Sequence, residues 1–438
     1  VSYPGYLSHF ITVVLNASTA DGYNPYRITR RGTDWETEDP DDPWSHIGYW
    51  GDHQVIYLLR LLEAYERHAP GALRAGLDER VYAYADVPYR ISGFDALVAD
   101  PKHTITFDHG RNEALLASAH ELGADGKLVR EADGEVRLVS LAEKLLVPLL
   151  VKLTNLVPGS GIWLNTQRPE WNDANNALAG WGLSLVTLNA VARYARFLRN
   201  TFPEKVVTEL SASVHALLLE LDEILRSAEL PTDDEQRLAT MGQLGRAGER
   251  HRAAVYAGDF GEAVPADAAT IHSLLDSTVR LAEATIDAGR RADGLFHSYD
   301  ILKLDGAGAG AGARVEHLGP MLEGQVAVLE SGLLDDADAV ELLRALRASG
   351  LYRADQHSYL LYPDRPPVPF LERNTLAGAP PMTEPSIFVV DREGKWHFHA
   401  DLSTLANVEE RLAAVDASPA VREEVRALWR ATFAHDAF

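Results

Sequence analysis

The chain has 438 residues, of which 46% are hydrophobic and 24% charged, and its formal net charge is −23. This composition excludes a disordered chain, and the negative charge argues against binding to nucleic acid or to an anionic membrane, because both attract basic surfaces. The chain contains no cysteine, which excludes disulfides and thiolate metal sites. Together with the lack of a visible signal peptide, this favours a cytoplasmic protein.

Apolar residues recur at helical spacing along most of the chain, as Val55, Leu58, Leu59 and Leu62 do. The pattern predicts twelve helices, over residues 4–17, 52–67, 110–123, 138–155, 174–199, 204–228, 234–257, 266–290, 320–333, 336–349, 402–413 and 419–434. Twelve helices without a fixed-period repeat indicate six hairpins closed into a ring. The predicted fold class is therefore all-α, an (α/α)6 toroid or six-hairpin barrel, in a single catalytic domain over residues 1–438.

Few segments have strand character. We expect a short strand at 360–362 and a β-hairpin that pairs 387–390 with 396–399. Long irregular stretches are more informative, because long loops in a compact domain are often functional. We expect them to form the active-site mouth of the barrel, and they cover residues 18–50, 76–109, 156–173, 291–319 and 351–401.

The first candidate site lies in residues 32–54, where three tryptophans and several carboxylates share a loop rich in Gly and Pro. Aromatic rings stack on sugars and carboxylates bind their hydroxyl groups. We predict that Trp35, Trp50 and Asp52 bind substrate, with Trp50 stacking on a sugar ring. The alternative is that Asp52 caps the helix over 52–67 and that a tryptophan packs in the core.

The second candidate site is the densest group of polar side chains in the sequence. It combines an aromatic ring, amides, a guanidinium and a carboxyl, the mixture that a sugar site requires. We predict that Asp173 is catalytic and that Arg168, Trp171, Asn172 and Asn176 bind substrate. The alternative assigns Asp173 to the N-cap of the helix that follows.

The run from Glu170 to Asn176, Glu-Trp-Asn-Asp-Ala-Asn-Asn, resembles the Asp-Trp-Asn-Asp-Gly-Met-Asn signature of glycoside hydrolase family 94, which contains cellobiose and chitobiose phosphorylases. The resemblance implies an (α/α)6 barrel in which Asp173 is the general acid. Glu170 and Ala174 depart from the signature, which indicates a distant relative or a neighbouring barrel family. Such barrels usually carry a β-rich domain upstream. Because the chain begins at Val1, the sequence leaves open whether such a domain precedes it.

The third candidate site lies in residues 314–325. Pro320 suits the first turn of a helix, which would bring Glu323 to the mouth of the cavity. We predict Glu323 as the general base, with Glu316 in reserve, and Gln325 as a substrate-binding residue. The alternative is that Glu323 merely complements the helix dipole.

A late polar loop contains His357, which we predict to bind substrate or phosphate. His103, Asp108 and His109 have a metal-like composition but lack metal-ligand spacing. We therefore predict no metal site and no cofactor.

These residues predict an inverting glycoside hydrolase that acts on an oligosaccharide, with Asp173 as acid and Glu323 as base about 6.5–9.5 Å apart. One alternative is an inverting phosphorylase, in which inorganic phosphate replaces water and is bound by Arg314, His317, Arg353 and His357. The other is a noncatalytic helical toroid that binds carbohydrate.

Overall fold

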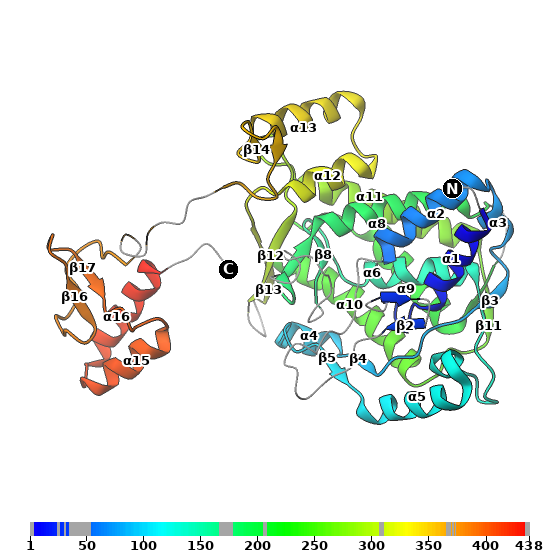
Figure 1. Ribbon diagram of the computed structural model, residues 1–438, viewed down its shortest axis with the longest axis horizontal. Helices are drawn as coiled ribbons and strands as arrows, with labels where there is room; N and C mark the ends of the chain where they lie inside the picture. The colour runs from blue at the N-terminus through cyan, green and yellow to red at the C-terminus, as the bar shows by residue number, and fades with distance from the viewer. Residues whose placement is uncertain are drawn as a thin grey trace. The chain divides into compact units, whose positions relative to one another are not determined.

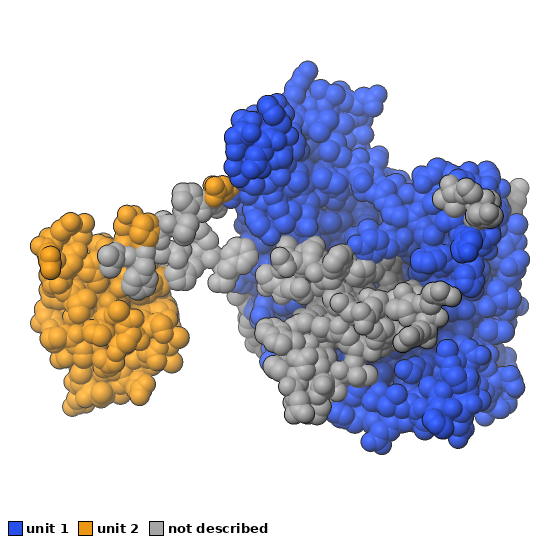
Figure 2. Space-filling model, in the orientation of Figure 1, with its two compact units in different colours: residues 1–363 blue, residues 364–438 orange. Residues whose placement is uncertain are grey.

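The computed structural model describes residues 4–23, 27–29, 32–34, 54–165, 178–204, 208–305, 311–364, 369, 372 and 374–433. The chain separates into two compact units, residues 1–363 and 364–438 (Figure 2), where the sequence analysis expected one domain. Among the described residues, no helix is both long and apolar enough to span a bilayer.

The first unit is built mainly from helices, coloured from blue to yellow in Figure 1. A π-helical turn over Gln54–Leu58 leads into α2, and a 3₁₀ turn over Gly123–Lys127 follows α5. The helices are α1 (Pro4–Asn16), α2 (Leu59–His68), α3 (Ala72–Ala75), α4 (Phe94–Ala99), α5 (His109–Leu122), α6 (Leu141–Leu153), α8 (Leu185–Thr201), α9 (Ala212–Ser227), α10 (Asp234–Tyr256), α11 (Ala268–Ala288), α12 (Leu322–Ser331) and α13 (Asp336–Ala348).

Side-chain caps fix where several of these helices begin. Ser140, Ser184 and Asp233 each accept a hydrogen bond from the backbone N–H three residues later, at the starts of α6, α8 and α10. Such caps satisfy backbone donors that have no partner within the helix. Asp108 and Asp335 cap α5 and α13 in the same way.

Short antiparallel strands alternate with the helices. Five of them form one sheet in the order β13-β12-β9-β8-β7; they are β7 (Leu156–Val157), β8 (Gly161–Trp163), β9 (Gly182–Ser184), β12 (Tyr299–Asp305) and β13 (Gly312–His317). The others pair in twos, β1 (Arg27–Thr29) with β2 (Gly32–Asp34), β3 (Arg80–Tyr82) with β6 (Val139–Ser140), β4 (Tyr89–Ile91) with β5 (Ile105–Phe107), β10 (Thr208–Ser211) with β11 (Ala263–Ala266), and β14 (Tyr352–Arg353) with β15 (Ser358–Tyr359).

The second unit is small and has its own core. A hairpin of β16 (Phe388–Val390) and β17 (Trp396–Phe398) packs with α15 (Leu405–Ala414) and α16 (Pro419–Thr432). A capping box between Thr404 and Asn407 starts α15, and Ser418 followed by Pro419 starts α16. This unit confirms the hairpin predicted at 387–390 and 396–399.

The prediction of an all-α toroid is wrong, because the first unit is a mixed α/β structure. All twelve predicted helices have a counterpart, but the stretch 291–319, expected to be irregular, supplies β12 and β13. Among the described residues, β9 and β10 lie inside the helices predicted over 174–199 and 204–228, and α8 and α9 begin after these strands, at Leu185 and Ala212. Most strands in this unit have two to four residues, too few for an alternating pattern to distinguish them from loops.

Helix α6 is the innermost element of the first unit, and every one of its residues is buried. A helix that is apolar on nearly all sides belongs inside a core, but α6 also carries Glu143 and Lys144 into the interior. The Glu143 carboxylate accepts hydrogen bonds from the Tyr84 hydroxyl at 2.9 Å and from the Ser211 backbone N–H at 2.6 Å. The Lys144 ammonium lies 3.7 Å from the centre of the Tyr84 ring and donates to the Ser18 carbonyl at 3.3 Å.

Replacing Glu143 with Ala should therefore destabilise the protein strongly. The substitution leaves the Ser211 N–H without its acceptor and Lys144 without a neighbouring negative charge, and removing one partner from a buried charged network costs about 3–5 kcal/mol. Urea unfolding measures the loss. The control is Glu113→Ala on exposed α5 surface, which should change stability by less than about 0.5 kcal/mol. Similar losses in the two variants would show that the buried network contributes little.

Candidate functional site

Most of the predicted site residues lie outside the described residues. This applies to Trp35, Trp50, Asp52, Arg168, Trp171, Asn172, Asp173 and Asn176. Of the predicted site residues, the structure describes Glu323, Gln325 and His357.

Glu323 lies in the first turn of α12, as predicted, and is partly buried. Burial raises the pKa of its carboxyl, and a hydrogen bond with Tyr299 opposes this rise. Glu323 lines a cavity of about 290 Å³ between α2, α8 and α12, together with Asn189 and Arg193. A carboxyl with a raised pKa beside a cavity is a candidate acid or base.

Glu316, the reserve candidate for the base, has the opposite environment. A hydrogen bond from Arg314 lowers the pKa of its carboxyl, and Lys303 lowers it further. The Arg314 nitrogen lies 2.5 Å from a Glu316 oxygen, on the exposed surface of β13. A carboxylate stabilised by two cations is a weaker base, so the structure favours Glu323.

Tyr299 links Glu323 to the region around the Trp-Asn-Asp segment. It is buried in a small apolar cluster with Leu164, Leu178 and Met321. Leu164 and Leu178 are described residues on either side of the segment 166–177. The backbone closes the base of this segment, because Gly180 N–H donates to the Leu164 carbonyl at 2.6 Å and Leu164 N–H donates to the Gly182 carbonyl at 2.9 Å. The described residues on either side of the segment therefore belong to the same cluster as Tyr299.

Gln325 does not have the surroundings of a substrate-binding residue. It is 0% exposed. Its side-chain oxygen accepts from the Phe296 N–H, and its amide nitrogen donates to the carbonyls of Phe296 and Met321, each at 2.8 Å. Sequence could not distinguish this buried amide from an exposed one, because it stands only two positions from Glu323 in the same helical turn. The structure assigns it to holding α12 against the preceding loop.

His357 lies on the exposed turn between β14 and β15 and has a positive φ of 48°. Its ring nitrogen Nδ1 is 3.2 Å from the Tyr352 hydroxyl. The other predicted phosphate ligands have carboxylate partners. Arg353 pairs with Asp355 at 2.7 Å and Arg314 with Glu316. Pairing of this kind leaves less positive charge for a phosphate ion.

A second polar group lies in and beside the five-stranded sheet, and His317 is its one member that the sequence suggested, as a phosphate ligand. Asp300, which is buried on β12, accepts hydrogen bonds from the Ser160 hydroxyl at 2.8 Å and from His317 Nδ1 at 2.9 Å. His297 Nδ1 is 3.9 Å from the same Asp300 oxygen. The two histidine rings stack with centroids 4.2 Å apart and an angle of 17° between their planes.

Ligand atoms of His297, Asp300 and His317 lie within 4.8 Å of one another, the range in which a metal ion can be held. However, a metal ion lies in the plane of each imidazole that binds it, and nearly parallel stacked rings share no such position. The arrangement therefore suits a proton shared between the Asp300 carboxylate and an imidazole. Binding of a metal ion would require one of the two rings to rotate.

No protein-family model matches the chain, and no curated protein matches it. The resemblance of residues 170–176 to glycoside hydrolase family 94 therefore stays a prediction.

The two stacked histidines should titrate on opposite sides of the usual histidine pKa of 6.5. The hydrogen bond with Asp300 raises the pKa of His317, whereas burial lowers the pKa of His297. Protonated His317 therefore stabilises the fold below pH 6.5, and this contribution is lost as the pH rises through the folded-state pKa. NMR titration of the imidazole signals measures both values. In Asp300→Asn the pKa of His317 should fall, and an unchanged value would contradict this assignment.

Proposed function

We propose that the protein is an inverting glycoside hydrolase that acts on an oligosaccharide, with Glu323 as the general base and Asp173 as the general acid. The observation that carries the proposal is the position of Glu323. It lines a cavity, burial raises its pKa, and its partner Tyr299 shares an apolar cluster with Leu164 and Leu178, which lie on either side of the Trp-Asn-Asp segment. The sequence of that segment supplies the second carboxyl.

In the proposed reaction, Glu323 removes a proton from a water molecule that attacks the anomeric carbon. Asp173 donates a proton to the glycosidic oxygen as the bond to the leaving sugar breaks. The anomeric centre of the sugar that water attacks is inverted, and this mechanism requires the two carboxyl groups to be about 6.5–9.5 Å apart to admit the water. A base works best when its pKa is near the working pH, which is the direction in which burial shifts Glu323.

The phosphorylase alternative needs cations that can bind inorganic phosphate opposite Asp173. Three of its four candidate ligands, Arg314, His317 and Arg353, are paired with carboxylates in the structure, so the proposal favours water as the acceptor. Product analysis on a panel of disaccharides and oligosaccharides, with and without phosphate, separates the two reactions. Cleavage that requires phosphate and yields a sugar phosphate would replace the hydrolase proposal with the phosphorylase.

Glu323→Gln should lower kcat by about 10²–10⁴, because it removes the general base while preserving the shape of the side chain. The measurement is release of reducing sugar from the best substrate of the panel. The matched control is Glu235→Gln, since Glu235 is also in the first turn of a helix, α10, but is exposed. If Glu323 only complemented the helix dipole, both variants would keep full activity and the proposal would fail.

Asp173→Asn tests the noncatalytic alternative, in which the protein only binds carbohydrate. An acid catalyst contributes about 10²–10⁴ to the rate, so the hydrolase proposal predicts a loss of at least this size with substrate binding retained. Binding without turnover in the wild-type protein would favour the noncatalytic alternative.

The pH–rate profile should report the environment of Glu323. The base must be ionised, so activity should fall as the pH drops through its pKa, which lies above the ordinary value of 4.5. Tyr299→Phe removes the hydrogen bond that lowers this pKa, so the acidic limb of kcat should move to higher pH. A limb that stays in place would show that another group controls the rate.

A further inference from the structure

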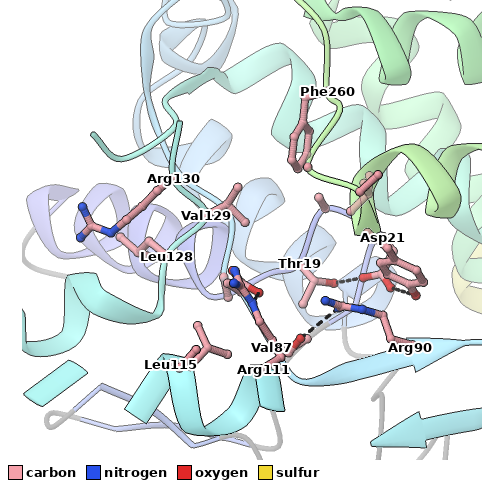
Figure 3. A pocket seen from close by; sticks show the side chains of 18 of the residues that line it. Thr19, Asp21, Val87, Arg90, Arg111, Leu115, Leu128, Val129, Arg130 and Phe260 are labelled. Atoms are coloured by element: carbon pink, nitrogen blue, oxygen red, sulfur yellow. Dashed lines mark hydrogen bonds and ion pairs between the residues drawn. The ribbon is translucent and has the colours of Figure 1, made fainter. Parts of the chain in front are cut away.

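A second cavity, of about 400 Å³, lies in the first unit, away from the residues that line the Glu323 cavity. It is enclosed by the turn that follows α1, the segment 85–90, helix α5, the segment 126–130 and the end of α10. This volume is within the range of small-molecule sites. Figure 3 shows its side chains, with Arg90, Arg111 and Asp21 at the lower and right-hand side.

Both carboxylates that line this cavity are already bound by protein donors. Asp21 accepts the Thr19 hydroxyl at 2.5 Å on one oxygen and the Tyr256 hydroxyl at 2.7 Å on the other. Asp86 pairs through both oxygens with the guanidinium of Arg111. Neither carboxylate is therefore well placed to bind a cation or the hydroxyl groups of a sugar.

Among the described residues that line the cavity, Arg90 is the guanidinium best placed to bind a ligand. Its guanidinium lies 4.6 Å from the centre of the Tyr256 ring. The two hydrogen bonds that the structure gives its side chain, to the carbonyls of Val87 at 3.2 Å and Tyr89 at 3.1 Å, both come from one terminal nitrogen. Within the described ranges, no carboxylate forms an ion pair with Arg90. A guanidinium held by a ring and two carbonyls presents its other N–H groups in a fixed fork, which matches a carboxylate or phosphate.

The opposite side of the cavity is apolar. Leu115, Leu128, Val129 and Phe260 line it (Figure 3). Arg130 also belongs to the lining, but its guanidinium donates to the carbonyls of Gly134 and Asp125 and points outward in Figure 3. The cavity thus combines one oriented cation with an apolar wall.

We propose that this cavity binds a small organic anion, with its carboxylate or phosphate group on Arg90 and its body against the apolar wall. The proposal does not depend on the hydrolase activity. An anionic ligand would give Arg90 the negative partner that the cavity does not supply, because the carboxylates of Asp21 and Asp86 are bound by other protein groups. Since carboxylates and phosphates share this recognition chemistry, the test must separate them.

Isothermal titration calorimetry tests the proposal with phenyl phosphate, benzoate and neutral benzyl alcohol as probes, whose common aromatic ring matches the apolar wall. We expect one of the two anions to bind more tightly than benzyl alcohol, and the better anion identifies the head group. Arg90→Gln should weaken anion binding at least tenfold, because it removes a charged hydrogen-bond donor. Arg90→Lys keeps the charge but loses the fork, so it should give an intermediate affinity.

The matched control is Arg246→Gln, because Arg246 also lies over an aromatic ring, that of Phe94 at 5.1 Å, but is paired with Asp95 on the surface. This variant should bind the anion as the wild type does. The proposal is overturned if neither anion binds, if benzyl alcohol binds as tightly as the anions, or if the Arg90 and Arg246 variants lose the same affinity. Circular dichroism of each variant shows whether the fold is intact, and Arg90→Lys decides the question if Arg90→Gln is unfolded.

Discussion

The architecture of the first unit depends on burying two side chains of opposite charge in the first turn of α6, a helix whose residues are all buried. Glu143 and Lys144 are each 1% exposed, and burial lowers the pKa of the Lys144 ammonium well below its usual value. Such groups are tolerated only where the protein supplies their partners. Here the partners are Ser18 after α1, Tyr84 after β3 and Ser211 before α9. Helix α6 therefore fixes three segments that are far apart in the chain. Two of them continue directly into the walls of the Arg90 cavity, at Thr19 and Ala85.

Successive side chains of strand β12 point to opposite faces of the sheet, so neighbouring residues have different partners. Tyr299 joins the apolar cluster beside Glu323, whereas its neighbour Asp300 binds Ser160 and His317. The same strand pairs with β9 at Tyr299–Ser184 and with β13 at Asp300–His317. This seven-residue strand thus connects the candidate base, the described residues on either side of the Trp-Asn-Asp segment and the histidine pair. A shift of one residue in its register would disrupt all three.

The sequence predicted those features that depend on neighbouring residues. Long amphipathic segments such as 234–257 and 266–290 and the hairpin around Gly394 are local patterns, and the structure contains them as α10, α11 and β16–β17. The sheet was missed because β8 and β9 have three residues each and gain their stability from partners elsewhere in the chain. The same limit applies to the site. Glu323 could be selected from its place in a helical turn, but neither the role of Tyr299 nor the burial of Gln325 has any signal in local sequence.

The contrast between Glu316 and Glu323 shows what distinguishes a structural carboxylate from a candidate base. The two residues are seven positions apart in the sequence, and from sequence alone either is a candidate general base. Arg314 and Lys303 stabilise the negative charge of Glu316 and thereby lower the pKa of its carboxyl. Burial raises the pKa of Glu323, and a hydrogen bond with the neutral Tyr299 hydroxyl opposes this rise. A carboxylate stabilised by cations loses proton affinity, whereas one held by a neutral donor at a cavity wall retains it. The chemistry proposed for Glu323 therefore follows from its surroundings in the fold. Its position in the first turn of a helix does not by itself determine those surroundings.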